Sequence, residues 1–504
     1  MSKSSSGKGT LKPPFLLINY LAIRKVRTLK YRTNHTQSVR HQIKPRNPME
    51  IQELYSKQQV FFNSNETKNI SFRIEQLKKF RKKLEENESE LYAAIFEDFG
   101  KSEFETFESE LSLLYHEINI FVKNIKRWSR RKKVSTGLIN FPAKSYILPE
   151  PLGVTLVIGA WNYPYQLSML PAITAIAAGN TVIIKPSELP SKTSAIMAKI
   201  INTNFPSNFL HVVEGGIPVT NELLTHRFDK IFFTGSIPVG KIIYQAAAKH
   251  LTPVTLELGG KSPTFVLPDC DINVTAKRIV WAKFLNAGQT CVAPDYILVD
   301  QSIETKFLEA LRSNIKEFYT VSGETSDNYV QIINTANFDR LQKLLDPNKI
   351  YCGGEIDRER RFISPTILQN ISFDDKIMQD EIFGPILPVV SYTDINEAIQ
   401  HVKARPKPLA CYVYSKNRKT IAKVLKEVSF GGGAVNESVM HFANSNLPFG
   451  GVGLSGMGSY HGKSGFDTFS HFKSILDKPF WFEANIKYSP YSKNKLKIIK
   501  WLFK

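Results

Sequence analysis

Two series of short β-rich runs, alternating with helical stretches, limit the possible folds of this chain more than any other feature. The second series begins near Thr255 and runs to about Val435. Strands that alternate with helices predict parallel sheets covered by helices. A chain of 504 residues is also too long for a single core. In the first series the β-rich runs are Val154–Ile158, Thr181–Lys185 and Lys230–Phe233, and the helical stretches are 166–178, 192–203 and 239–249.

Two short motifs within these series carry groups suited to carbonyl chemistry. Glu257 stands in the stretch Thr255–Lys261, before two glycines, and Cys291 closes the stretch Asn286–Cys291, 34 residues later. A thiol can attack a carbonyl carbon, and a carboxylate can activate a water molecule. Glycines let the backbone approach a ligand closely. We therefore take Cys291 as a candidate nucleophile and Glu257 as a candidate general base.

The stretch Phe233–Gly240 is a candidate dinucleotide-binding loop. A β-run precedes it and a helical run follows, so backbone N–H groups at a helix N-terminus could meet a pyrophosphate. Pro238 fits the first turn of that helix. The stretch Gly451–Gly456 also has the G-x-G-x-x-G spelling, but no strand precedes it and no helix follows, so it is predicted to be a loop. His441 and His461, in the same glycine-rich region, are predicted to have structural roles.

Several further motifs occur in an order and spacing that resemble the aldehyde dehydrogenase superfamily. The resemblance covers about residues 49–475 and is nearest to the class 3, fatty-aldehyde type. It implies the fold of that family, an α/β fold with a Rossmann-like cofactor domain, an α/β catalytic domain and a β-arm for oligomerisation. The motifs are Pro151–Val154, Gly159–Pro164, Ile184–Glu188, Phe233–Ser236, Glu381–Pro385 and Pro448–Gly458.

The resemblance implies a reaction, the oxidation of aliphatic or aromatic aldehydes to carboxylic acids with NAD or NADP through a cysteine thioester. In this reading Cys291 attacks as the thiolate. The side chain of Asn162 and the backbone N–H of Cys291 hold the oxyanion, and Glu257 activates the water that hydrolyses the thioester.

The same resemblance implies the residues that hold the cofactor. Lys185 and Glu188 would bind the adenosine ribose, and a carboxylate there favours NAD over NADP by repelling a 2′-phosphate. Glu381 and Phe383 would hold the nicotinamide ribose and pack near the nicotinamide. The complete predicted set is Trp161, Lys185, Glu188, Gly235, Ser236, Gly240, Leu258, Glu381 and Phe383.

Two other functions stay open at this point. One is a semialdehyde dehydrogenase that acts on a polar metabolite. The other is a non-catalytic basic binding protein, because the formal net charge is +20. Residues 1–48 carry 11 of the 66 basic side chains and none of the 46 acidic ones, so 55 basic side chains face 46 acidic ones in the remainder. No nucleic-acid-binding motif is present, and we expect no nucleic-acid partner.

The four cysteines, at 270, 291, 352 and 411, are scattered and have no metal-ligand spacing. They predict free thiols, a reducing and cytoplasmic location, and no metal. No apolar run reaches the ~18 residues that a membrane helix needs.

The chain is predicted to divide into five parts. Residues 1–48 form a basic appendage, which is either a disordered arm, an organellar transit peptide, or untranslated sequence before a start at Met49. Residues 49–255 form the NAD(P)-binding domain with N-terminal helices, 256–435 the catalytic domain, and 436–475 the oligomerisation arm of an expected homodimer. Residues 476–504 form a basic amphipathic tail that could touch a membrane surface peripherally.

Overall fold

The computed structural model describes residues 48–321, 324–325 and 329–503. The predicted appendage therefore lies outside the described residues, apart from Pro48, at which the first helix begins. Helices precede the sheets, where N-terminal helices were predicted. They are α1 (Pro48–Asn63), α2 (Ile70–Glu85), α3 (Glu88–Phe99), α4 (Glu103–Thr106), a π-helical turn η2 (Phe107–Leu111) and α5 (Ser112–Trp128).

The first sheet has six strands in the order β19-β7-β6-β3-β4-β5. It contains the three β-runs predicted for the first series, and also β5 and β7, although the second series was expected to begin near Thr255, which lies in β7. Its first five strands in sequence are parallel, as predicted. The short strand β19 pairs antiparallel with β7 and places Gly456 opposite Glu257. The strands are β3 (Val154–Ile158), β4 (Thr181–Lys185), β5 (Leu210–Val212), β6 (Lys230–Thr234), β7 (Val254–Glu257) and β19 (Gly456–Met457).

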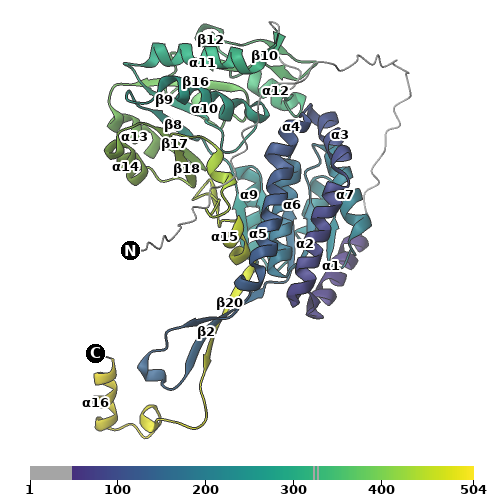
Figure 1. Cartoon of the computed structure of the whole chain (residues 1–504), viewed down its shortest axis with the longest axis vertical. Helices are drawn as coiled ribbons and strands as arrows, with labels where there is room; N and C mark the ends of the chain where they lie inside the picture. The colour runs from purple at the N-terminus through teal and green to yellow at the C-terminus, as the bar shows by residue number, and fades with distance from the viewer. Residues whose placement is uncertain (1–47, 322–323, 326–328, 504) are drawn as a thin grey trace, which may run out of the picture. The chain divides into compact units, whose positions relative to one another are not determined.

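Helix α6 lies at the centre of this half of the molecule. It contacts α2 and α5 as well as β3 and β4, and every one of its residues is buried. A helix surrounded by protein must be apolar on all sides, which explains why its sequence shows little amphipathic pattern. Figure 1 shows α2, α5 and α6 side by side. The helices that connect the strands are α6 (Pro164–Ala178), α7 (Ser191–Asn204), α8 (Ile217–Leu223) and α9 (Ile237–Ala248).

The second series forms a seven-stranded sheet in the order β12-β15-β16-β9-β8-β17-β18. All its pairs are parallel except β12 with β15. The two sheets and their covering helices confirm the predicted α/β class. The strands are β8 (Pro263–Val266), β9 (Tyr296–Asp300), β12 (Ile350–Cys352), β15 (Thr366–Leu368), β16 (Ile386–Tyr392), β17 (Ala410–Tyr414) and β18 (Gly432–Val435), and the helices are α10 (Ile272–Phe284), α11 (Glu304–Tyr319), α12 (Thr335–Gln342), α13 (Ile395–Lys403) and α14 (Arg418–Glu427).

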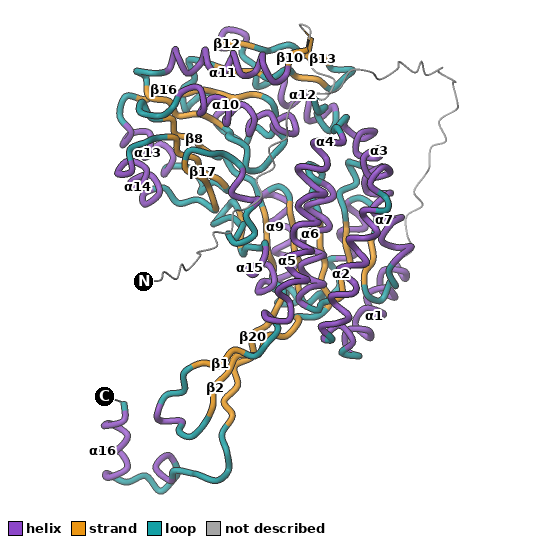
Figure 2. The backbone as a smooth tube through the Cα atoms, in the orientation of Figure 1, coloured by secondary structure: helices purple, strands orange, loops and turns teal. Residues whose placement is uncertain are grey.

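A third sheet has three antiparallel strands, β1 (Lys132–Val134), β2 (Lys144–Pro151) and β20 (Ser470–Asp477). Strands β2 and β20 pair along their full length, which Figure 2 shows as two adjacent orange segments. The segment 436–475, expected to form the arm, supplies six of the eight residues of β20, and it also contains β19 and a short helix, α15 (Gly462–Thr468). The division into domains remains a prediction.

The predicted tail helix is present as α16 (Lys493–Leu502). Ser492 caps its N-terminus by accepting a hydrogen bond from the Lys495 N–H. Within the described part of the chain, no helix combines the length and the apolar character that a membrane crossing requires.

Candidate functional site

A cleft of about 1150 Å³ opens where strands of the six-stranded sheet end. Residues at or just after the ends of β3, β4, β6 and β7 line it, and the opposite wall comes from α12 and from the segment 376–383. Ligands bind at the carboxyl ends of strands in open α/β sheets, and this volume exceeds that of ordinary small-ligand pockets. Eight of the nine predicted cofactor residues line the cleft, and so do Asn162, Glu257 and Cys291. The ninth, Gly240, lies one turn into α9.

The beginning of α9 fits a phosphate. Ser236 is the N-cap residue but its side chain makes no capping hydrogen bond, and Pro238 lies in the first turn. The first N–H groups of the helix are therefore available to an anion. A Cβ atom on Gly235 would lie 2.5 Å from the Phe233 ring, so this turn has no room for a side chain on that side.

Lys185 and Glu188 form an ion pair beside this turn. The Lys185 Nζ lies 3.1 Å from a carboxylate oxygen of Glu188 and 2.8 Å from the Pro186 carbonyl oxygen. Burial lowers the pKa of Lys185, and the neighbouring Glu188 opposes that shift. Glu188 is about half exposed, with 45% of its side chain accessible, so its carboxylate can also meet a ligand in the cleft.

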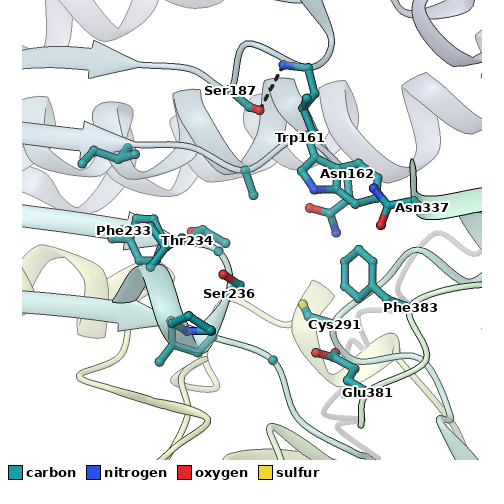
Figure 3. Close-up of a pocket in the computed structure, with 18 of the residues that line it drawn as sticks. Trp161, Asn162, Ser187, Phe233, Thr234, Ser236, Cys291, Asn337, Glu381 and Phe383 are labelled. Carbon is teal, nitrogen blue, oxygen red and sulfur yellow. Dashed lines mark hydrogen bonds between the residues drawn. The ribbon is translucent and has the colours of Figure 1, made fainter. Parts of the chain in front are cut away.

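At the other end of the cleft lie Glu381 and Phe383. The Phe383 ring packs edge-on against Trp161, with the ring centroids 5.4 Å apart, and Figure 3 shows Glu381 and Phe383 near Cys291. Burial, with the nearby Asp295 charge, raises the pKa of Glu381 to about 8. A Cβ atom on Gly259 would lie 2.0 Å from a Glu381 carboxylate oxygen, so the lack of a side chain at Gly259 leaves room for this carboxylate.

Cys291 follows a loop with unusual backbone angles. Asn286, Ala287 and Gly288 are three successive residues with φ of 53°, 50° and 71°. Only glycine adopts such angles without cost. Burial, followed by the charges of Glu381 and Glu257, raises the pKa of the Cys291 thiol to about 12. The thiol is therefore protonated at neutral pH in this state.

Glu257 ends β7 and is buried. Neither of its carboxylate oxygens has a hydrogen-bond partner among the residues that the structure describes. Burial raises its pKa well above the usual value for glutamate. A carboxyl group with a raised pKa is suited to take a proton near neutral pH.

Asn162 joins the two loops of the site. The Asn162 side-chain nitrogen donates to the backbone carbonyl oxygen of Gln289 at 3.0 Å. The backbone carbonyl oxygen of Asn162 accepts from the Asn286 side chain at 2.8 Å. Nearby, the Tyr163 hydroxyl and the Thr290 hydroxyl lie 2.6 Å apart. The loop before α6 and the loop before Cys291 are thus held against each other by side chains of both.

A second, narrow cavity of about 50 Å³ lies on the other side of the thiol. Cys291 and Glu257 line both this cavity and the large cleft, so they stand at the junction of the two. Aromatic and aliphatic side chains form most of its wall, and no Lys, Arg or Asp is among the described residues that line it. Its wall includes Tyr163, Leu167, Val292, Val439, Phe442, Phe449, Tyr460 and His461.

Several of these wall residues were not predicted from the sequence. Phe449, Tyr460 and His461 come from the glycine-rich segment, and Asn337 and Arg340 of α12 line the large cleft. His461 was expected to be structural, and burial lowers its pKa to about 3. Phe449 belongs to the motif Pro448–Gly458, but no local pattern indicates that these side chains line the site, because their place there depends on how distant segments pack.

The cleft at the strand ends and the helix N-terminus without a side-chain cap are features of a dinucleotide-dependent α/β enzyme. The sequence profile described as "Aldehyde dehydrogenase family" matches residues 23–475. The chain belongs to the aldehyde dehydrogenase family.

The relatives span nearly the whole chain. The 4,4'-diaponeurosporen-aldehyde dehydrogenase of Staphylococcus aureus is 47% identical over 456 residues, which cover 90% of this chain and 99% of that protein. Aldehyde dehydrogenase family 3 member A2 of Mus musculus is 46% identical over 437 residues, covering 86% and 90%. The dimeric NADP-preferring aldehyde dehydrogenase of Rattus norvegicus is 46% identical over 417 residues, covering 83% and 92%.

A solved structure from one of these organisms has a similar fold. A structure titled as the substrate-bound state of Staphylococcus aureus AldH is 47% identical, has a TM-score of 0.88, and covers 90% of this chain and 99% of its own. These findings confirm the predicted family, its fold and an enzyme that oxidises aldehydes to carboxylic acids with NAD or NADP. The alternative of a non-catalytic binding protein is thereby set aside.

Proposed function

We propose that the protein oxidises apolar aliphatic or aromatic aldehydes through a thioester on Cys291. The observation that carries this proposal is the position of the Cys291 thiol, which lines both the dinucleotide-sized cleft and the apolar cavity. An aldehyde that enters through the cavity would present its carbonyl carbon to the sulfur on the side where the cleft begins.

The proposed chemistry assigns one task to each of three residues. Cys291 loses its proton and its sulfur attacks the carbonyl carbon. The developing oxyanion is held by the Asn162 side-chain amide and by the backbone N–H of Cys291, as in other oxyanion holes. The carbon of the adduct would then lose a hydride to bound NAD or NADP, which leaves the thioester on Cys291 and the reduced cofactor. Glu257 then takes a proton from water, the water oxygen attacks the thioester carbon, and the carboxylic acid leaves as the sulfur is released.

The nine predicted cofactor residues fit a dinucleotide at three points. The pyrophosphate would meet the beginning of α9, with Gly235, Ser236 and Gly240, and Leu258 packs against this turn, 2.7 Å from where a Cβ on Gly240 would lie. In this proposal Lys185 and Glu188 bind the adenosine ribose, and Trp161, Glu381 and Phe383 contact the nicotinamide end. Because Glu188 is already paired with Lys185, its repulsion of a 2′-phosphate is weakened, so both NAD and NADP fit the proposal.

A substitution at the thiol tests the assignment. We expect Cys291→Ser to abolish oxidation of octanal while the protein still binds NADP, because an alcohol is a far weaker nucleophile than a thiolate. Cys411→Ser is the matched control, since Cys411 is fully buried in β17 and lines neither space. Turnover by Cys291→Ser at the wild-type rate would contradict the proposal.

An aldehyde panel tests the substrate class. An anionic semialdehyde would need a cationic side chain near its carboxylate, and none lies among the described residues of the cavity wall. We therefore expect kcat/KM to rise from propanal to octanal and decanal, and to be lower for succinic semialdehyde than for any of them. The reverse order would favour the semialdehyde alternative.

We also propose a homodimer, formed through the three-stranded arm, in the cytoplasm. Several large apolar side chains of β20 and of the segment between β1 and β2 are exposed, which is unusual for a surface that stays in water. Light scattering after gel filtration would measure the mass, and a monomer at micromolar concentration would contradict this part of the proposal. The exposed residues are Leu138, Ile139, Phe141, Phe472 and Leu476.

A further inference from the structure

A buried ion pair contacts the backbone of the loop that carries Asn162. Lys101 follows α3, Glu110 lies in η2, and the Lys101 Nζ is 2.8 Å from a Glu110 carboxylate oxygen. Both side chains are completely shielded from solvent. Transfer of two charges out of water is costly, and their mutual attraction alone seldom offsets it. Each partner is therefore expected to make further polar contacts.

Glu110 makes its further contacts at the N-terminus of α6. Its second carboxylate oxygen accepts from the backbone N–H of Tyr165 at 2.7 Å and of Gln166 at 3.3 Å. The N-cap residue Tyr163 makes no side-chain cap of its own. A carboxylate from another element thus caps the helix and interacts favourably with its dipole. The first turn of α6 is fixed to η2, immediately after Asn162.

Lys101 makes its further contacts with the two residues before that turn. Its Nζ donates to the Asn162 carbonyl oxygen at 3.4 Å and lies 4.3 Å from the centre of the Tyr163 ring. An ammonium group over an aromatic ring is attracted by the ring face. The Asn162 backbone is therefore held from behind by Lys101, while its side chain points to the loop that ends at Cys291.

We propose that Lys101 and Glu110 are positioning residues for the oxyanion donor Asn162. This inference rests on the proposed function, in which Asn162 holds the oxyanion. Neither residue lines the cleft or the apolar cavity, so neither contacts the reacting atoms. Their role is to keep the Asn162 amide in one place and orientation as negative charge develops, because donors that are placed beforehand need no reorganisation during the reaction.

A double-mutant cycle tests the inference. We expect Lys101→Met to lower kcat/KM for octanal by about ten- to a hundredfold, the range that a small misplacement of a catalytic group produces. The dissociation constant for NADP should not change. In an Asn162→Ala background the same Lys101→Met change should have almost no further effect, because the group that it positions is gone.

The outcomes separate this inference from the proposed function. If Asn162→Ala retains wild-type kcat/KM, the oxyanion assignment is wrong. If Asn162→Ala is slow but Lys101→Met lowers kcat/KM by the same factor in both backgrounds, Asn162 keeps its role and the positioning inference is overturned.

A second variant keeps the test valid if Lys101→Met folds poorly. Lys101→Met leaves the Glu110 charge unpaired, whereas Lys101→Met combined with Glu110→Gln removes both charges and keeps an oxygen that can cap α6. We expect this double variant to be folded and as slow as Lys101→Met, and wild-type kcat/KM in it would overturn the inference. Leu84→Ala, a core truncation in α2, is the control for loss of stability, and it should lower Tm without lowering kcat.

Discussion

At the residue scale, burial rather than hydrogen bonding sets the ionisation of the two central groups. Cys291 and Glu257 both have raised pKa values, with burial as the largest cause. The Glu257 charge also raises the pKa of the Cys291 thiol, because two negative charges in one dry space repel. Burial therefore favours the neutral forms of both groups, and the Cys291 thiol must lose its proton in the course of the reaction.

The first prediction concerns the proposed base. Glu257→Gln should slow hydrolysis of the acyl-enzyme more than hydride transfer, because an amide cannot take a proton from water. Rapid mixing with octanal and NADP should then show a burst of reduced cofactor, followed by a slow steady state. A slow first turnover without a burst would instead assign Glu257 to the ionisation of Cys291.

The second prediction concerns the charge of Glu381. Its pKa is raised to about 8, and its negative charge raises the pKa of the Cys291 thiol. Glu381→Gln should therefore leave the rate of alkylation of Cys291 by iodoacetamide almost unchanged at pH 7, where the wild-type carboxyl is mostly neutral. At pH 9 the wild-type carboxyl is ionised and the variant should react several-fold faster.

Glu188→Gln is the control for this measurement, because Glu188 also lines the cleft but is not among the groups that shift the Cys291 pKa. Slower alkylation of Glu381→Gln at pH 9 would contradict the electrostatic argument.

At the scale of elements, the loop η4 (Leu285–Gly288) before Cys291 is held under backbone strain. Asn286 and Ala287 both have left-handed angles, which cost non-glycine residues roughly 1–3 kcal/mol each. The Asn286 backbone N–H donates to Glu105 at 2.8 Å and its side chain donates to the Asn162 carbonyl oxygen, so surrounding contacts maintain this conformation. This backbone conformation sets the direction in which the Cys291 side chain leaves the loop.

The third prediction follows from Gly288 in this loop. A Cβ atom there would lie 2.3 Å from the Gly384 carbonyl oxygen, and the φ of 71° disfavours any side chain. Gly288→Ala should therefore lower the free energy of unfolding by at least about 2 kcal/mol and reduce activity strongly. Gly137→Ala is the matched control, since nothing lies within 4 Å of a Cβ at that position. Equal Tm values for the two variants in thermal melts would show that the loop can relax.

At the scale of the whole described chain, the C-terminal tail remains exposed. Trp501 and Phe503 have 74% and 70% of their surface accessible, and α16 carries several lysines beside them. A helix of this length reaches only about 15 Å, so it cannot span a bilayer. Apolar side chains flanked by lysines suit peripheral contact with an anionic membrane surface, which is where long aliphatic aldehydes partition.

The fourth prediction is a truncation before Tyr491. It should lower kcat/KM for hexadecanal in the presence of anionic vesicles by several-fold and leave kcat/KM for propanal unchanged. It should also abolish sedimentation with those vesicles. A Trp501→Ser and Phe503→Ser variant should reproduce both effects if the apolar side chains make the contact. Vesicle binding that survives truncation would exclude the tail as the membrane contact.

The sequence by itself determined the features that local pattern encodes. The strands β3, β4 and β6 and the helices that follow them are explained by apolar runs of the right length and by glycine and proline at their ends. The bounds of these three strands differ from the predicted ones by no more than one residue. The motifs around Glu257 and Cys291 were readable because the glycines and the reactive side chain lie within a few residues of each other. These local features were enough to predict the α/β class, the family and the reaction.

Only the tertiary structure decided which distant segments meet. The pairing of Lys101 with Glu110 and the capping of α6 by a carboxylate outside it involve residues that carry no local signal, and so do Val439 and Tyr460 in the wall of the apolar cavity. The three-stranded arm likewise joins β1 and β2 to β20, across more than three hundred residues. Such contacts depend on side chains that fill a common space and on charges that must find partners once they are buried, and neither condition is visible before the elements have packed.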